Sequence, residues 1–385
     1  MPSEFTTWHV ISPEYPPARG GVADYTRMVA LGLAAAGGRV HVWTPAVAGD
    51  DSHEPGVEVH RLPGCFGRQA LTTLGRELDA GAADRIVVQY VPQGYGMRGT
   101  NLPFCLWMLR WRRRDVTIMF HEVAVTLRRG QPLSHNVIGL VNRAMAFILT
   151  RVARRSFVAA AGWDRRLRPL APSGHSIIWL PVPSNVPVIE DSEGVRAVRQ
   201  TLAREGGMVI GHFGTAREKW IIERVQSSVL PLLRERPGAT LLLLGADSLL
   251  QRERLLATAP ELSARVSATG PLTPETLSLH LRACDMMVQP YDDGVSTRRG
   301  SMMAALAHRR AVVTTAGYLT EPLWAQCRAV ALAPVSEPAA LASMVARLMD
   351  DAAERARLGQ AAGKLYAERF DLAHTLAALT ETERV

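Results

Sequence analysis

The feature that most constrains this chain is a regular alternation of short apolar runs with longer stretches of helical periodicity. Short β-branched runs are typical of buried parallel strands, and helices between them supply the crossovers that parallel strands need. The alternation therefore predicts an α/β fold of parallel sheets covered by helices. We expect strands near residues 7–12, 39–44, 57–62, 85–91, 116–121, 156–160, 176–181, 208–213, 239–245, 265–269, 285–289, 311–315 and 329–333.

A length of 385 residues favours two domains over one. The best linker candidate is the proline-rich segment 180–194, LPVPSNVPVIEDSEG, which ends in acidic residues. We predict two Rossmann-like, doubly wound domains that face a cleft, residues 1–185 and 186–367. Residues 368–385 are expected to form a C-terminal helix that packs back on the first domain.

Composition excludes several classes of protein. Hydrophobic residues make up 47% of the chain and charged residues 21%, which is typical of a globular protein. No apolar run is long enough to span a membrane, and the start, MPSEFTTWHV, lacks the basic and apolar regions of an export signal. The four cysteines show no CxxC spacing, which argues against a disulfide framework or zinc. We therefore expect a cytoplasmic protein.

The net charge of +8 is carried almost entirely by arginine, since Lys219 and Lys364 are the only lysines. This balance favours anionic partners such as phosphates, phospholipid headgroups or nucleic acid. It also arises in a genome that favours arginine codons. Zinc-finger, homeodomain-like and RNP patterns are missing from the sequence, so we expect no nucleic-acid partner.

Polar or glycine-rich residues follow several predicted strands, at the sheet edge where α/β proteins bind ligands. Gly20 and Gly21 stand between the first strand and an apolar helix. They provide either a tight turn with positive φ or a loop whose amides approach a ligand at the positive end of a helix. His121 follows the strand at 116–120 and is either structural or a hydrogen-bonding partner for a sugar hydroxyl or a phosphate.

The second half carries two such loops. Arg217 and Lys219 lie between a strand and a helix, where a guanidinium fork and a point charge suit a diphosphate; a solvated helix start is the alternative. After the strand at 285–289, a turn precedes a helix that should begin near Arg298. Ser296 and Thr297 are candidate N-caps, and helix-start amides would face a phosphate. Arg298 and Arg299 oppose the helix dipole, so a nearby anion would account for them; a capped surface helix is the alternative.

These motifs, in this order, resemble the GT-B retaining glycosyltransferases, specifically glycosyltransferase family four. The resemblance covers nearly the whole chain and rests on an ordered set of loose motifs. They are ARGGVADY after the first strand, FHE at 120–122, SNVP in the linker, HFGTAREK, LLLLGAD, ATGPLTPETLSLHLRACDMMVQPY and MAALAHRRAVVTT.

The resemblance implies an acceptor-binding first domain and a donor-binding second domain. Catalytic residues would be His121 near the donor sugar, Arg217 and Lys219 on the diphosphate, and Asp293. The donor-binding residues would be Gly20, Gly21, Gly214, Thr215, Gly270, Leu272, Gly294, Val295, Ser296, Thr297, Arg298, Arg299 and Ser301.

Two departures from the family pattern stand out. The family commonly has two glutamates eight residues apart, whereas one alignment places Ser296 and Ala304 there and another places Asp293 and Ser301. We prefer the alignment that uses Asp293, which leaves the ribose contact undefined. The family also usually turns on a glycine where this chain has the run 308–310, HRR.

The expected activity is transfer of a sugar, with retention, from a nucleotide-diphosphate donor to a hydroxyl acceptor. A UDP-sugar is favoured, and a lipid-linked glycan, a polysaccharide or a small metabolite could accept it. We expect no cofactor and no metal, because the acidic pair Asp292-Asp293 stands alone in a glycine turn. The alternatives are a GT-B sugar-nucleotide epimerase and a non-catalytic GT-B binding or scaffold protein.

Residues 102–114, LPFCLWMLRWRRR, combine aromatic and aliphatic side chains with a terminal arginine block. This mixture is typical of an interfacial helix on an anionic membrane, which would place the protein peripherally on the inner face. A core helix with a solvated basic end has the same composition. Both interpretations stay open from the sequence.

Overall fold

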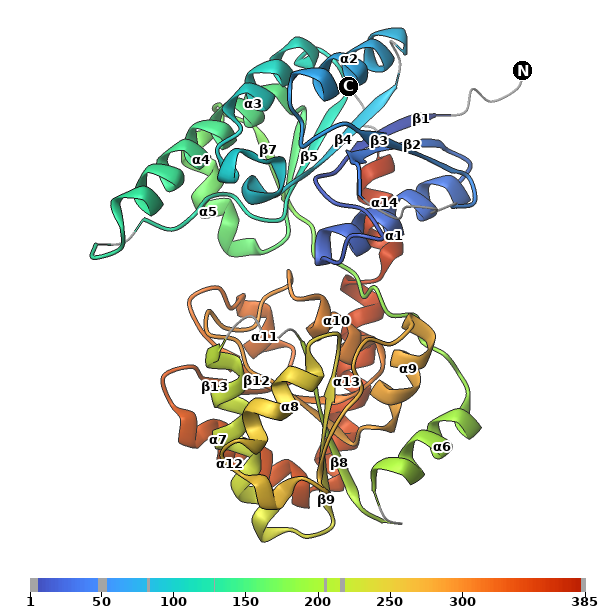
Figure 1. The fold of residues 1–385 in the computed structure, drawn as a ribbon, viewed down its shortest axis with the longest axis vertical. Helices are drawn as coiled ribbons and strands as arrows, with labels where there is room; N and C mark the ends of the chain where they lie inside the picture. The colour runs from blue at the N-terminus through green and yellow to red at the C-terminus, as the bar shows by residue number, and fades with distance from the viewer. Residues whose placement is uncertain are drawn as a thin grey trace. The chain divides into compact units, whose positions relative to one another are not determined.

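The computed structural model describes residues 6–47, 54–81, 84–127, 129–203, 206–214 and 219–381, and it divides into two compact units (Figure 1). Unit 1 comprises Met1–Val182 with Leu372–Val385, and unit 2 comprises Pro183–Asp371. Each unit contains one parallel sheet with helices packed on it, which confirms the predicted fold class. Every predicted strand has a counterpart among the observed ones.

Unit 1 has a seven-stranded sheet in the order β3-β2-β1-β4-β5-β6-β7. Its strands are β1 (Thr7–Ile11), β2 (Arg39–Pro45), β3 (Val57–Leu62), β4 (Arg85–Tyr90), β5 (Val116–Phe120), β6 (Arg155–Val158) and β7 (Ser176–Trp179). Its α-helices are α1 (Gly21–Ala35), α2 (Arg68–Ala80), α3 (Leu102–Met108), α4 (Leu133–Val152), α5 (Asp164–Leu167) and α14 (Leu372–Thr380). Short 3-10 helices lie at η1 (Pro92–Tyr95), η2 (Met97–Gly99), η3 (Leu109–Trp111), η4 (Ala161–Trp163) and η5 (Arg168–Leu170).

Unit 2 repeats the plan with six strands in the order β10-β9-β8-β11-β12-β13. They are β8 (Met208–Phe213), β9 (Ala239–Leu244), β10 (Val266–Ala268), β11 (Met286–Gln289), β12 (Ala311–Ala316) and β13 (Ala331–Pro334). The helices are α6 (Ser192–Leu202), α7 (Lys219–Glu235), α8 (Ser248–Leu256), α9 (Pro274–Ala283), α10 (Gly300–Ala307), α11 (Pro322–Gln326), α12 (Pro338–Asp350), α13 (Ala352–Arg369) and the 3-10 helix η6 (Pro260–Leu262).

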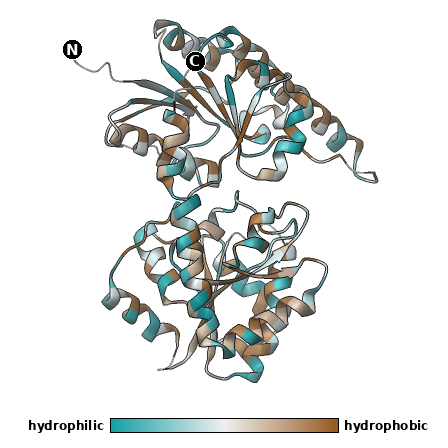
Figure 2. Cartoon of the chain, turned by 180° about the vertical axis from the view of Figure 1, so that it is seen from behind, coloured by the Kyte–Doolittle hydropathy of each residue, from teal (hydrophilic) through white to brown (hydrophobic). Residues whose placement is uncertain are grey.

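The core of unit 2 lies between its sheet and the covering helices. Every residue of β9 is buried, and Val225, Val229 and Leu233 of α7 pack into the same cluster. The spacing of these α7 residues is that of one helix face. Figure 2 shows the result as brown, apolar strands inside helices that are coloured teal on their outer sides. Among the described residues, none of the helices is both apolar enough and long enough to traverse a bilayer.

The last helix returns to unit 1. Arg85 donates to the carbonyls of Leu379 and Thr380, and Arg155 donates to those of Ala378 and Leu379. These guanidiniums satisfy carbonyls that the end of α14 leaves without helical partners. Helix α14, red in Figure 1, also contacts α1. The boundaries of the units therefore fall at 182/183 and 371/372.

The acidic end of the predicted linker has a local role. Asp191 accepts hydrogen bonds from the amides of Glu193 and Gly194 and so caps α6. The linker proper is therefore shorter than the sequence suggested, because its acidic tail belongs to a helix start.

Residues 102–114 pack as a core element of unit 1. Phe104 and Met108 are fully buried, and Trp111 is 2% exposed. The ring of Trp111 lies 4.2 Å from that of Trp107, and both rings lie against Gly75 of α2. The α-helix itself is only seven residues long. This packing is what the core-helix interpretation predicts.

We expect Trp111→Ala to lower the free energy of unfolding by about 3–5 kcal/mol, because it leaves a large cavity. Leu106→Ala, on the same segment but 51% exposed, is the matched control and should change stability little. Chemical denaturation of both variants, alongside binding to anionic vesicles, gives the answer. A Trp111→Ala protein of normal stability that no longer binds vesicles would restore the interfacial interpretation.

Candidate functional site

The strand order of each sheet indicates where a ligand binds. In both units the chain starts in the middle of the sheet, builds outward to one side, and then crosses to the other side. The crossing lies between β1 and β4 in unit 1 and between β8 and β11 in unit 2. Doubly wound sheets bind ligands outside the carboxyl ends of the strands at this point. The loops after these four strands are therefore the candidate sites.

In unit 2, the loop after β11 is organised around a buried carboxylate. Asp293 is 5% exposed and pairs with the guanidiniums of both Arg298 and Arg299. Burial by itself would raise the pKa of Asp293, but Arg299 and Arg298 together hold it below its ordinary value. Asp293 is therefore ionised at neutral pH. The sequence predicts an anion near Arg298 and Arg299. In this structure that anion is the carboxylate of Asp293, in the same loop.

Two glycines allow this loop to press against the loop that follows β12. Gly294 has φ +87°, and a Cβ there would lie 2.2 Å from the backbone nitrogen of Gly317. A Cβ on Gly317 would in turn lie 2.6 Å from the carbonyl of Asp293. The amide of the buried Val295 donates to the carbonyl of Thr315. The backbone around Asp293 is therefore held by close contact between the two loops.

The prediction that Ser296 and Thr297 cap a helix near Arg298 is wrong. Helix α10 begins at Gly300, and neither side chain caps it. Thr297 instead donates through its amide and its hydroxyl to the buried carboxylate of Glu321, at 3.2 and 2.9 Å. The hydroxyl of Ser296 is buried and has no hydrogen-bond partner among the described residues. Long-range contact with Glu321, rather than local capping, shapes this segment.

Ser301 lies in the first turn of α10, where its hydroxyl is 3.0 Å from the hydroxyl of Tyr291. The guanidinium of Arg299 lies over the Tyr291 ring, 4.7 Å from its centroid. The structure thus brings Asp293, Arg298 and Arg299 together and places Ser301 next to them through Tyr291.

On the other side of the crossing, the loop after β8 begins at Gly214. His212 donates through Nδ1 to the carbonyl of Val288, and its buried Nε2, close to Gly214, has no partner among the described residues. Burial lowers the pKa of His212, so this nitrogen carries a lone pair rather than a proton. Thr215 and Arg217 lie outside the described residues, and Lys219 begins α7 with an undescribed side chain.

Gly270 and Leu272 follow β10, which is two strands away from β8. Gly270 has φ +67°, and its amide donates to the hydroxyl of Ser248 at 2.8 Å. Among the described residues, no hydrogen bond joins Gly270 or Leu272 to the loop around Asp293.

In unit 1, His121 follows β5 and is almost completely buried. Its Nε2 lies 2.8 Å from Oε1 of Gln89 at the end of β4, and its ring meets Tyr25 of α1 edge-on. Burial lowers the pKa of His121 to about 3, so the imidazole is neutral at physiological pH. Such a ring can donate a hydrogen bond to a hydroxyl or accept one from it. It is too weak a base to act as a general base.

The role expected for Gly20 and Gly21 needs correction. The amides of Val22 and Ala23, which could have faced a ligand, donate instead to Glu14 at 3.2 and 3.3 Å. A Cβ on Gly20 would lie 2.4 Å from that carboxylate, whereas one on Gly21 would meet nothing within 4 Å. Gly20 has φ −178°, so the tight-turn interpretation with positive φ is also wrong. Gly20 makes room for Glu14, which occupies the helix start.

Comparison with known proteins agrees with this architecture. The model of the family "Glycosyl transferases group 1" matches residues 207–351, within unit 2. None of the curated proteins matches the sequence. The solved structures with similar folds include WaaG, a glycosyltransferase involved in lipopolysaccharide biosynthesis (16% identity, 97% of this chain and 100% of that one, TM-score 0.68). Sucrose-phosphate synthase from Thermosynechococcus elongatus (19%, 97% and 97%, 0.71) and HepE of Anabaena with UDP and glucose (16%, 98% and 98%, 0.68) are others.

The chain has the GT-B fold of the group 1 glycosyltransferases. Within this GT-B chain, the matched segment contains the Asp293 loop, Gly214, Gly270 and Glu321. The sequence did not indicate four further residues: Glu14, Gln89, His212 and Glu321. Gln89, His212 and Glu321 act through partners at least 24 residues away in the chain. The sequence also did not indicate a group of two imidazoles and one carboxylate that the structure brings together, His41, Glu58 and His60.

We expect Gly294→Ala to lower the free energy of unfolding by about 3 kcal/mol or more, since it adds backbone strain and a clash with Gly317. Gly300→Ala is the matched control, because its Cβ meets no atom and α10 gains helix propensity. That variant should be unchanged or slightly more stable. Thermal unfolding of the two GT-B variants distinguishes them, and equal melting temperatures would contradict the described loop contact.

Proposed function

We propose that the protein is a retaining glycosyltransferase that moves a sugar from a nucleotide-diphosphate donor to a hydroxyl acceptor. A UDP-sugar is the favoured donor, and a lipid-linked glycan, a polysaccharide or a small metabolite is the acceptor class. The match of residues 207–351 to group 1 glycosyl transferases supports the activity. The choice of UDP is supported by structural neighbours: HepE was solved with UDP and with UDP-glucose, and another is a UDP-forming trehalose-phosphate synthase.

The observation that carries the proposal is the cluster of Asp293, Arg298 and Arg299 at the carboxyl edge of the sheet in unit 2. One buried carboxylate faces two guanidiniums, while Asp292 adds only a 3.9 Å contact from an exposed position. A guanidinium is a planar fork of N–H donors whose geometry suits phosphate oxygens. Asp293 fixes the positions of both arginine side chains at the carboxyl edge of the sheet.

The same residues could stabilise the negative charge that develops on the leaving group. Breaking the bond between sugar and diphosphate builds negative charge on the departing phosphate, which cationic and N–H groups stabilise. Four cationic side chains would supply this stabilisation without a metal: Arg298, Arg299, Arg217 and Lys219. The amides of Val295 and Thr297 already donate to Thr315 and Glu321 and are not part of it. The role that we still propose for Gly20 and Gly21 is to form part of the surface beside the acceptor. Neutral His121 would hydrogen-bond a sugar hydroxyl, and Gly270 and Leu272 would border the nucleobase.

The alternatives are less well supported. An epimerase needs a carboxyl group that exchanges protons, whereas Asp293 is held ionised between two arginines. A non-catalytic scaffold is favoured by the missing glutamate pair: the preferred alignment places Asp293 and Ser301 at these positions, and the other places Ser296 and Ala304 there. Ser296 Oγ and His212 Nε2, beside the crossing, lack hydrogen-bond partners within the described part of the chain, and this favours a bound ligand instead.

Membrane contact through residues 102–114 forms no part of the proposal, because two of the aromatic side chains that suggested it, Phe104 and Trp111, are buried. A cytoplasmic location remains our expectation.

The test is a thermal-shift screen against UDP, GDP, CDP and ADP, followed by assays of UDP release with UDP-sugars and simple acceptors. A ligand at 100 times its dissociation constant stabilises the native state by about 2.7 kcal/mol, so binding is visible as a higher melting temperature. NMR of the product at the anomeric carbon reports retention or inversion. Nucleotide binding without transfer to any acceptor supports a non-catalytic scaffold protein. If no nucleotide raises the melting temperature, the proposal is overturned.

Lys219 gives a sharper test, because the chain contains only one other lysine. We expect Lys219→Ala to reduce turnover on the order of a hundredfold, by removing a charge that acts on the leaving diphosphate. Lys219→Arg should restore part of the activity, because a planar fork places its charge differently. Lys364→Ala is the control, since its exposed ammonium forms a surface pair with Glu368 at 3.8 Å. Equal turnover of both alanine variants would remove Lys219 from the donor site.

A further inference from the structure

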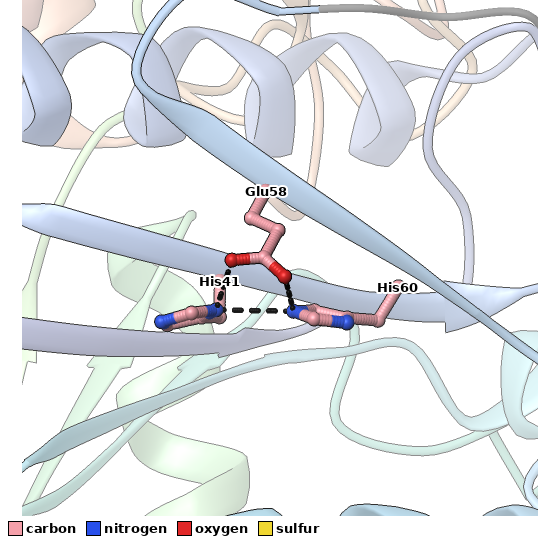
Figure 3. Close-up of side chains that lie close together, drawn as sticks. All are labelled: His41, Glu58 and His60. Carbon is pink, nitrogen blue, oxygen red and sulfur yellow. Dashed lines mark hydrogen bonds and ion pairs between the residues drawn. The ribbon is translucent and has the colours of Figure 1, made fainter.

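A row of aromatic and titratable side chains covers one face of β1, β2 and β3 in unit 1. Three of them converge on a single point: His41 from β2, and Glu58 and His60 from β3 (Figure 3). None of the three is a residue of the proposed donor or acceptor site. Their positions lie in the body of the strands, away from the loops that follow β1 and β4.

Strand periodicity explains why these side chains meet. Glu58 and His60 are two residues apart and therefore point to the same face of β3. The parallel register pairs His41 with Glu58 and Trp43 with His60. His41 and Trp43 are also two apart, so all four side chains share one face, while Val40 and Val42 point to the other.

The distances between the three groups are those of a metal-ligand set. Nδ1 of His41 lies 3.0 Å from Nε2 of His60 and 3.3 Å from Oε2 of Glu58. Nε2 of His60 lies 3.5 Å from Oε1 of Glu58. Tetrahedral zinc binds nitrogen and oxygen at about 2.0–2.1 Å, which places neighbouring ligand atoms about 3.3–3.4 Å apart. The three separations bracket this edge length.

Aromatic stacking holds both imidazoles in this orientation. The ring of Trp43 lies parallel to that of His60 at 3.9 Å, and the ring of His9 lies parallel to that of His41 at 5.3 Å. His9 is fixed in turn, because Trp43 donates to its Nδ1 and Asp84 contacts its Nε2. The two histidine ligands are thus positioned by the fold itself, as in preformed metal sites.

We propose that His41, Glu58 and His60 bind one Zn²⁺ ion, with water as the fourth ligand. Three lone-pair donors that converge on one point can share a cation, and two imidazoles with one carboxylate suit zinc better than magnesium or calcium. The carboxylate of Glu58 is 65% exposed, so the site is open to solvent on the side where water would bind. The sequence argument against zinc considered cysteine spacing and did not cover this donor set.

The ion would connect β2 to β3, the strand at the edge of the seven-stranded sheet. An edge strand has a hydrogen-bonded neighbour on one side only, so it opens more easily than an inner one. A metal bound to both strands in the native state and not in the unfolded state shifts the equilibrium toward the folded chain. The role is structural, and no step of sugar transfer passes through it.

The experiment titrates the full chain, with any purification tag removed, with Zn²⁺ by isothermal calorimetry in a buffer that does not chelate metal. The expected result is one equivalent bound and a higher melting temperature. Co²⁺ serves as the second probe, because a tetrahedral site gives intense visible absorption bands that hydrated Co²⁺ lacks. A chain that binds no Zn²⁺, or that gives only the hydrated Co²⁺ spectrum, overturns the proposal.

Variants locate the ion. Glu58→Gln changes one exposed ligand with little effect on packing, and we expect at least tenfold weaker Zn²⁺ binding. His60→Ala should abolish binding, but it also removes a stacked ring. If His60→Ala fails to fold, Glu58→Gln still tests the proposal. His135→Ala, an exposed histidine on α4, is the control and should bind normally. Unchanged affinity in Glu58→Gln and His60→Ala would place the ion elsewhere and overturn the assignment.

Discussion

The contact between Asp293 and the guanidiniums of Arg298 and Arg299 organises the loop at the centre of unit 2. Without this carboxylate, two like charges would lie side by side at the positive end of α10, which is unfavourable. With it, the arginines are fixed, Gly294 can press against Gly317, and the loop acquires one defined shape. The donor site that we propose therefore depends on an ion pair inside a single loop rather than on the glutamates of the family pattern.

The sequence predicted the fold well because strand and helix periodicity is a local property. The alternation located every strand, and only the ends differed, as where Asp191 caps α6 and shortens the linker. Residues 102–114 show the limit of this reasoning. Composition was the same for a core helix and an interfacial helix, and only tertiary packing around Trp111 distinguished the two.

The candidate site was predicted less well, because its side chains find partners that lie far along the chain. The local sequence predicts that Thr297 is an N-cap. In the structure its hydroxyl and amide instead donate hydrogen bonds to Glu321, which is 24 residues further along the chain. The group of His41, Glu58 and His60 left a weak signal, since Glu58 and His60 alternate on a predicted strand. Register, which places His41 opposite Glu58, cannot be read from one sequence, and a slip of one residue would separate them.

The first six strands of the two units have the same order, but the charges beside the two crossings differ. This difference suggests a division of labour. In unit 1 the amides at the start of α1 are satisfied by Glu14, so a phosphate there would meet a carboxylate instead of free N–H groups. The nearby imidazole of His121 is neutral. In unit 2 two guanidiniums, those of Arg298 and Arg299, face one carboxylate. This contrast supports our proposal that the diphosphate binds in unit 2 and uncharged hydroxyl groups bind in unit 1.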